Sequence, residues 1–170
     1  KNMDKVEKIA SIVLPNQLFE KSPVFSSRST IYLVEESLFF NQYVFHKQKL
    51  FFHRLSMKKY QNFLTGKGIN VKYIDASEKL SDVRKLIENI SSNYNTIQII
   101  DPNDFLVEKR LKRVCVKLNL KLIILENPTF LCKKGDLNFF KPDKKKFFQT
   151  SFYKYQREKF NILIDIAGGP

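Results

Sequence analysis

The chain has 170 residues, 43% of them hydrophobic, and this length suits one ordinary domain with one buried core. Lysine and arginine number 30 against 17 acidic residues, which gives a formal charge of +13 and a pI of about 9.7. Such an excess makes nucleic acid a reasonable partner, although a lysine-rich surface also serves solubility alone. No apolar run approaches the length of a membrane span or a signal-peptide core, so we expect no membrane partner and a soluble cytoplasmic protein.

Five short runs rich in apolar and β-branched residues predict buried strands. They are Ser11–Leu14, Thr30–Val34, Asn70–Ile74, Thr96–Ile100 and Lys121–Leu125. The first connection, residues 15–29, has no convincing helical pattern.

Three segments with helical periodicity lie between the second and fifth of these strands. The first runs from about His46 to Leu64, the second follows Ser81 as its N-cap, and the third follows Asn103 or Asp104. This alternation of strands and helices predicts an α/β fold, with a doubly wound, five-stranded, mainly parallel sheet and helices on both faces.

The composition changes after Glu126, where proline, lysine and aromatic residues dominate. A basic aromatic stretch from Lys144 to Arg157 could contact DNA, but packing of its aromatic side chains is the interpretation we favour. We therefore divide the chain into an α/β domain, residues 1–140, and a basic aromatic helix with a linker, residues 141–170. Cys115 on a helical stripe and Cys132 after a strand lack metal-ligand spacing, and we expect both to be buried thiols.

Polar or acidic residues follow each predicted strand directly. Asn16 and Gln17 follow the first, Glu35 the second and Asp101 the fourth, and parallel strands bring these ends to one edge. Ligands of doubly wound sheets bind at that carboxyl edge, where the strand order reverses, so we expect a binding crevice there. The alternative is that these residues only meet solvent and cap helices.

Several common sites are disfavoured. The turn after the first strand has no glycine-rich phosphate loop, which argues against an ordinary NAD or ATP site. His46 and His53 lack nearby partners in metal-ligand or triad spacing. Glu35 and Glu36 are adjacent and point to opposite faces, so they can be ligand contacts at most. We predict no catalytic residue and no metal ligand.

An ordered set of short motifs spans nearly the whole chain. It comprises Leu14-Pro15-Asn16-Gln17-Leu18, Tyr43-Val44-Phe45-His46-Lys47-Gln48-Lys49, Asp101-Pro102-Asn103-Asp104, Phe130-Leu131-Cys132, and the run from Phe152-Tyr153 to Gly169-Pro170. This set resembles the photolyase-related family, the bacterial photolyases and cryptochromes that carry an iron–sulfur cluster.

The resemblance implies the N-terminal, antenna-type α/β domain of a flavoprotein that performs light-driven repair of ultraviolet-damaged DNA. It implies that FAD, the iron–sulfur cluster and most of the DNA-binding surface lie in a helical domain beyond Pro170, so we expect no cofactor in this fragment and DNA as a partner through the full-length protein. The residues that it places on a rim for an antenna chromophore are Asn16, Gln17, Glu35, Tyr43, His46, Lys47, Asp101, Pro102 and Asp104. Two alternatives stay open: a blue-light signalling cryptochrome, and a small-ligand binding module without a light function.

The chain departs from the family pattern at two places on this rim. Asn16 replaces the Asp of the first turn, and Phe39 or Phe40 replaces a Glu that often precedes the His-Lys run in relatives that bind lumazine. A missing acceptor leaves the polar edge of a lumazine ring poorly paired. We therefore expect a lumazine antenna to bind weakly or not at all.

Overall fold

The computed structural model describes residues 7–26, 29–133, 135–136 and 148–164. It divides into two compact units, Lys1–Asn127 and Pro128–Pro170. The boundary predicted from the sequence, between residues 140 and 141, and the linker 165–170 lie outside the described residues.

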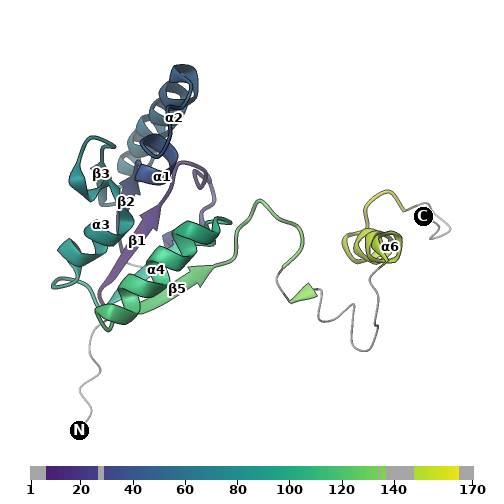
Figure 1. Ribbon diagram of the computed structural model, residues 1–170. Coiled ribbons are helices and arrows are strands. Elements are labelled where there is room, and N and C mark those ends of the chain that lie inside the picture. The colour runs from purple at the N-terminus through teal and green to yellow at the C-terminus, as the bar shows by residue number, and fades with distance from the viewer. Residues whose placement is uncertain (1–6, 27–28, 134, 137–147, 165–170) are drawn as a thin grey trace, which may run out of the picture. The chain divides into compact units, whose positions relative to one another are not determined.

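The first unit contains a five-stranded sheet in which every pairing is parallel (Figure 1). Its strands, in the spatial order β3-β2-β1-β4-β5, are β1 (Ile9–Val13), β2 (Thr30–Val34), β3 (Val71–Ile74), β4 (Thr96–Ile100) and β5 (Lys121–Leu125). From β1 the chain adds β2 and then β3 on one side of β1, and it then adds β4 and β5 on the other side of β1. The strand order therefore reverses between β1 and β4. The predicted doubly wound α/β fold is confirmed.

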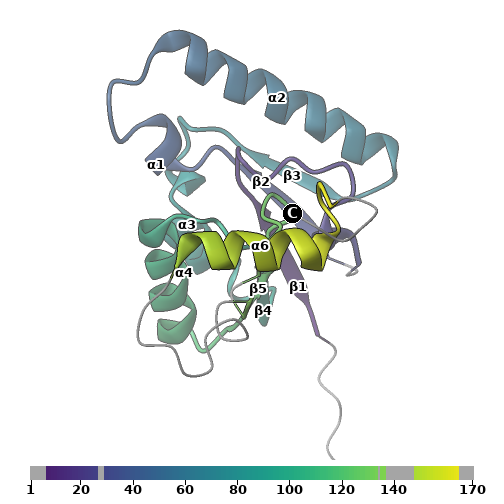
Figure 2. The ribbon, with the colours of Figure 1, turned by 90° about the vertical axis from the view of Figure 1, so that its right-hand side faces the viewer.

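Helices cover both faces of this sheet, as the two ribbon views show (Figures 1 and 2). One face packs against α2 (Lys47–Gly66) and the short 3₁₀ helix η1 (Pro23–Ser26), which occupies the connection without a helical pattern. The other face packs against α3 (Val83–Ile90) and α4 (Phe105–Lys117). The strands alternate their apolar side chains between these layers: Ile12 and Ile99 join the α3–α4 side, and Val13 and Ile100 join the α2 side.

The sequence signals locate most helix ends correctly. Met57, Tyr60 and Leu64 form the buried stripe of α2, with His53 half-buried beside them. The N-cap of α3 is Asp82 rather than the predicted Ser81. Ser81 ends the short 3₁₀ helix η2 (Lys79–Ser81), and the carboxylate of Asp82 accepts a hydrogen bond from the Arg84 backbone N–H. A four-residue helix, α1 (Ser37–Phe40), follows β2 and was not predicted.

The second unit contains one described helix, α6 (Gln149–Phe160), within the basic aromatic stretch. Tyr153 is more than half exposed while Tyr155 is half-buried, so the aromatic side chains of α6 are only partly packed. Lys159 of α6 pairs with Asp136 at 2.6 Å. Cys132 is exposed, so the expectation that both thiols are buried is correct for Cys115 and wrong for Cys132, which lies in an exposed turn after the strand. No helix of the described residues is long and apolar enough to cross a membrane.

Candidate functional site

The reversal of strand order is bridged by the side chain of Gln17. Its Oε1 accepts a hydrogen bond from the Leu14 backbone N–H at 3.1 Å, and its Nε2 donates to the Ile100 carbonyl at 2.8 Å. Gln17 is fully buried. One amide therefore joins the end of β1 to the end of β4, at the point where neighbouring loops of a doubly wound sheet separate.

The turn after β4 lies against the turn after β1. The exposed Asn16 donates from Nδ2 to the Pro102 carbonyl at 3.4 Å. The Asp101 carboxylate accepts from the Asn103 backbone N–H at 3.1 Å, and Asn103 has the left-handed φ of 50° that asparagine tolerates. The structure therefore brings together four of the expected rim residues: Asn16, Gln17, Asp101 and Pro102.

Asp104 belongs to the same turn, and its carboxylate is the N-cap of α4. Its Oδ1 accepts from the Val107 backbone N–H at 2.9 Å. This contact satisfies one of the free N–H groups at the start of the helix. The sequence leaves two roles open for Asp104, ligand contact and helix cap. The structure shows Asp104 as a helix cap.

Glu35 lies at the end of β2 in a closed network on the α2 side. It accepts from Nε of Arg54 at 2.7 Å, the hydroxyl of Tyr73 at 2.5 Å and the backbone N–H of Ala76 at 2.9 Å, and Nη2 of Arg54 contacts its second oxygen. Burial raises the pKa of Glu35, but these donors outweigh it and hold the pKa below its ordinary value of 4.5. Both oxygens carry two donors, so the carboxylate has no acceptor position left for a ligand.

Glu36 is fully buried on the opposite side of the strand, as the sequence predicts. It accepts from the Val83 backbone N–H at 2.8 Å and from Arg110 at 3.2 Å, and thereby links β2 to α3 and α4. Burial dominates over these bonds and raises the pKa of Glu36 above 4.5. The two adjacent carboxylates hold different helices and share no partner.

The remaining rim residues, Tyr43, His46 and Lys47, lie in and after the loop from α1 to α2 and are exposed. His46 is the N-cap of α2, where its Nδ1 accepts from the Gln48 backbone N–H at 3.2 Å. Tyr43 packs edge-on against Phe45, with ring centroids 5.8 Å apart. These side chains are presented to solvent, unlike Gln17 and Glu35, which are enclosed in the protein.

The model of the deoxyribodipyrimidine photo-lyase-related protein family matches residues 11–170, which include most of β1, the strands β2 to β5 and α6. The chain belongs to this family. One relative is the uncharacterized protein R852 of Acanthamoeba polyphaga mimivirus, which is 38% identical over 168 residues. The alignment covers 91% of this chain and 84% of the viral protein.

Two features of the described residues bear on metal and chromophore binding. No group of three or more His, Cys, Asp or Glu side chains is arranged for a metal there, and the chain's two cysteines cannot supply the four ligands of an iron–sulfur cluster. Phe40 is buried in the α2-side core, and Phe39 is half-buried against both cores. Neither side chain offers an acceptor where the family pattern has a Glu.

No pattern in the sequence indicates Arg54 or Tyr73 as partners of Glu35. Arg54 follows His53 on a lysine-rich helix, and Tyr73 is one aromatic residue among several in a short strand. The available signal was indirect, because a carboxylate that ends a buried strand requires a nearby cation or several donors. In this photolyase-related domain that requirement is met from α2 and β3.

Proposed function

We propose that this chain is the N-terminal, antenna-type domain of a photolyase- or cryptochrome-related flavoprotein and contributes to light-driven repair of ultraviolet-damaged DNA in the full-length protein. The observation that carries the proposal is the family match over residues 11–170, which includes the strands on both sides of the reversal. The cofactor-rich helical domain is expected beyond Pro170. The flavin, where bound, supplies the photochemistry, and this domain contributes the scaffold beside it.

The role of the domain is structural rather than chemical. Gln17 closes the gap between β1 and β4, and Glu35 and Glu36 are satisfied by protein donors. Among the expected rim residues, those exposed in the structure are Asn16, Tyr43, His46 and Lys47, and their polar atoms could meet a chromophore. Such a rim orients a ligand weakly, because it offers no buried polar group aimed at one.

Photorepair by the full-length gene product tests the proposal. Ultraviolet-irradiated plasmid DNA is incubated with the purified protein under blue light and in the dark, and the remaining lesions are counted. Lesions should disappear only in the light. Unchanged lesions in the light would refute a repair function, and a light-induced change in the protein without loss of lesions would favour the signalling alternative.

Antenna binding is tested by titrating 6,7-dimethyl-8-ribityllumazine into the 170-residue chain and following its fluorescence. Loss of one hydrogen bond of the kind made by the missing Glu costs about 1–3 kcal/mol, or roughly ten- to a hundredfold in affinity. The expected result is binding weaker than micromolar. Submicromolar binding would show that the rim holds the ring through groups other than the Glu of the family pattern.

A second candidate is a free-standing small-ligand module without a light function. It is favoured by the extent of the viral match, because the 16% of that protein outside the alignment is smaller than an ordinary domain. The genomic sequence downstream of the codon for Pro170 separates the two candidates. A coding sequence for a large helical domain supports the flavoprotein, and its absence supports the module.

A further inference from the structure

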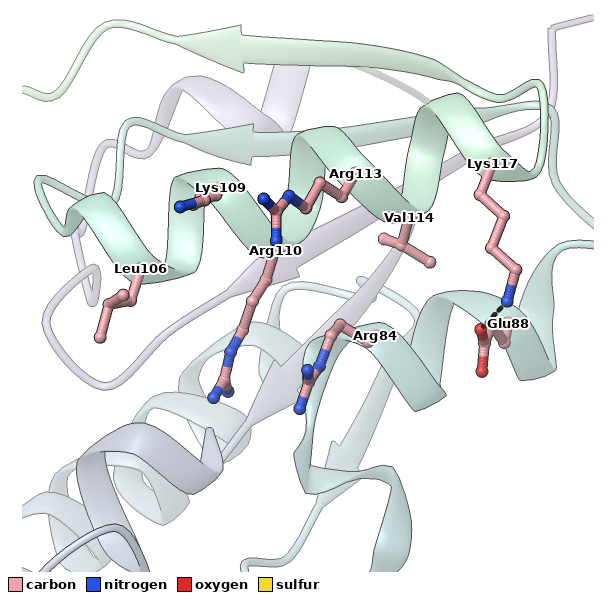
Figure 3. A pocket seen from close by; sticks show the side chains of 8 residues that line it. All are labelled: Arg84, Glu88, Leu106, Lys109, Arg110, Arg113, Val114 and Lys117. Atoms are coloured by element: carbon pink, nitrogen blue, oxygen red, sulfur yellow. Dashed lines mark hydrogen bonds and ion pairs between the residues drawn. The ribbon is translucent and has the colours of Figure 1, made fainter.

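A groove of about 370 Å³ lies between α3 and α4, on the face of the sheet opposite α2 (Figure 3). One wall is a stripe of α4 residues spaced three or four positions apart, and the other wall is the outer side of α3. The side chains that the argument uses are Arg84 and Glu88 of α3 and Lys109, Arg110, Arg113 and Lys117 of α4.

The lining of this groove is strongly cationic. Five of its eight residues are Lys or Arg, and its single acid, Glu88, is paired with Lys117 at 2.9 Å. Lys109 and Arg113 have no carboxylate partner among the described residues. Two positive charges of the groove are therefore uncompensated, and they add to the charge of +13 of the chain.

Two of the arginines are held in place by carboxylates outside the groove. Arg110 pairs with the buried Glu36 at 3.2 Å, and Arg84 pairs with Asp82 at 2.5 Å. Figure 3 shows both guanidinium groups extending in the same direction from their helices. Anchoring of this kind lowers the conformational entropy that a cation loses when it meets an anion.

The shape of the site fits a polymer of phosphates better than a single phosphate. From Leu106 to Lys117 the α4 stripe is about 16 Å long at 1.5 Å per residue, and phosphates of one DNA strand recur every 3.4 Å or so along the helix axis. Compact phosphate sites use free N–H groups at helix starts. Here the N–H groups of Val83 and Arg84 at the start of α3 already donate to Glu36 and Asp82.

We propose that the α3–α4 groove binds the sugar–phosphate backbone of duplex DNA, independently of base sequence. The lining contains no aromatic side chain on which unstacked bases could stack, which favours a duplex over a single strand. Contacts from Lys and Arg to phosphates fix a protein on the duplex but carry no sequence information. This activity requires neither flavin nor light, so it stands or fails separately from photorepair.

The test measures binding of a fluorescent DNA duplex to the 170-residue chain by anisotropy at several salt concentrations. The variant Lys109→Gln/Arg113→Gln removes the two unpaired cations. The matched control, Lys59→Gln/Lys67→Gln, removes the same charge from α2 and its C-cap. Circular dichroism establishes that all three proteins are folded.

Each lost phosphate contact lowers the slope of log K against log salt by about 0.9, which at 0.1 M salt corresponds to roughly eightfold in affinity. The groove variant should therefore bind about 60-fold more weakly than the wild type, with a slope smaller by about 1.8. The control should keep most of the wild-type affinity and slope. Glu88→Gln should strengthen binding, because it releases Lys117. Equal losses in the groove variant and the control would overturn the proposal, as would an unchanged groove variant.

Discussion

At the scale of single residues, Gln17 is the side chain on which the centre of the sheet depends most directly. Its amide pairs one backbone donor of the β1 turn and one backbone acceptor of β4, and it is fully buried. A leucine of similar size would leave both backbone groups without a partner in the protein interior. Unpaired buried groups are costly even where the lost hydrogen bond itself is worth little.

We therefore predict that Gln17→Leu lowers the free energy of unfolding by about 2–5 kcal/mol, since two buried groups lose their partners. Urea denaturation measures the change. Asn16→Ala serves as the control, because Asn16 is exposed and its one contact is 3.4 Å long, and it should cost no more than about 0.5 kcal/mol. Equal stabilities of the two variants would show that Gln17 does not tie β1 to β4.

The adjacent carboxylates Glu35 and Glu36 are predicted to have opposite effects on the pH dependence of stability. The pKa of Glu35 is lowered in the folded state, so its ionised form stabilises the fold above pH 4.5. This stabilisation is lost as the pH falls through the lowered pKa. The pKa of Glu36 is raised in the folded state, so just above pH 4.5 the folded protein holds a proton on Glu36 that the unfolded protein has lost. Stability therefore falls as the pH rises through that range.

Urea midpoints of Glu35→Gln and Glu36→Gln between pH 3 and 8 test this difference. Glu35→Gln should cost about 1.5–3 kcal/mol at neutral pH, because it weakens the charge-assisted hydrogen bonds from the half-exposed Arg54 to the buried carboxylate, and the deficit should shrink in acid. Glu36→Gln keeps an acceptor for Val83 and removes a buried charge, so relative to the wild type it should gain stability as the pH rises. Parallel pH profiles for the two variants would contradict the assignment.

At the scale of elements, two aspartates fix where the α3–α4 layer begins. Asp82 and Asp104 each accept a hydrogen bond from an N–H in the first turn of the following helix, at 2.9 Å in both cases. These carboxylates also place a negative charge at the positive end of the helix. The loops that follow β3 and β4 are therefore defined by caps as much as by packing.

Asp104→Ala is predicted to lower the free energy of unfolding by about 1 kcal/mol, the usual value of an N-cap. Asp104→Asn keeps the accepting oxygen and should lose only a few tenths of a kcal/mol from the helix dipole. Thermal denaturation of both variants gives the comparison. If the asparagine variant were as unstable as the alanine variant, the cap hydrogen bond would not be the stabilising interaction.

The strands and long helices were predictable because their burial leaves a periodic trace. The spans Thr30–Val34, Thr96–Ile100 and Lys121–Leu125 agree with the structure residue for residue, and α2 begins one residue after the predicted start. The cap of α3 was misplaced by one residue, because Ser81 and Asp82 are both good caps and only the backbone conformation distinguishes them. The helix α1 has four residues, which is too short for a period to appear.

At the scale of the whole molecule, parallel topology explains which part of the rim could be predicted. Strand ends that are neighbours in the sheet, such as those of β1 and β4, do bring Asn16, Gln17 and Pro102 together. The partners of Glu35 come from α2 and β3, and their contact depends on how a helix lies across the sheet. A strand pattern contains no information on that geometry.

The purified 170-residue chain is expected to contain neither FAD nor stoichiometric iron. Two cysteines cannot ligate a cluster, and the sequence shows no flavin pocket. An absorption spectrum and an iron assay on the isolated protein measure both. A flavin band or one iron–sulfur cluster per chain would contradict this prediction.

The position of β1 in the sheet also determines when the chain can complete its fold during synthesis. β1 is made first and lies in the centre, and its second neighbour, β4, pairs with it only after Thr96–Ile100 have emerged from the ribosome. Until then a nascent sheet of β1, β2 and β3 presents the bare edge of β1 for several seconds at ordinary rates of translation. Such an edge invites pairing with other chains. Translation pauses that leave Ile74 outside the ribosome and Thr96–Ile100 still inside it should therefore increase aggregation of this protein, and pauses after Ile100 has emerged should not.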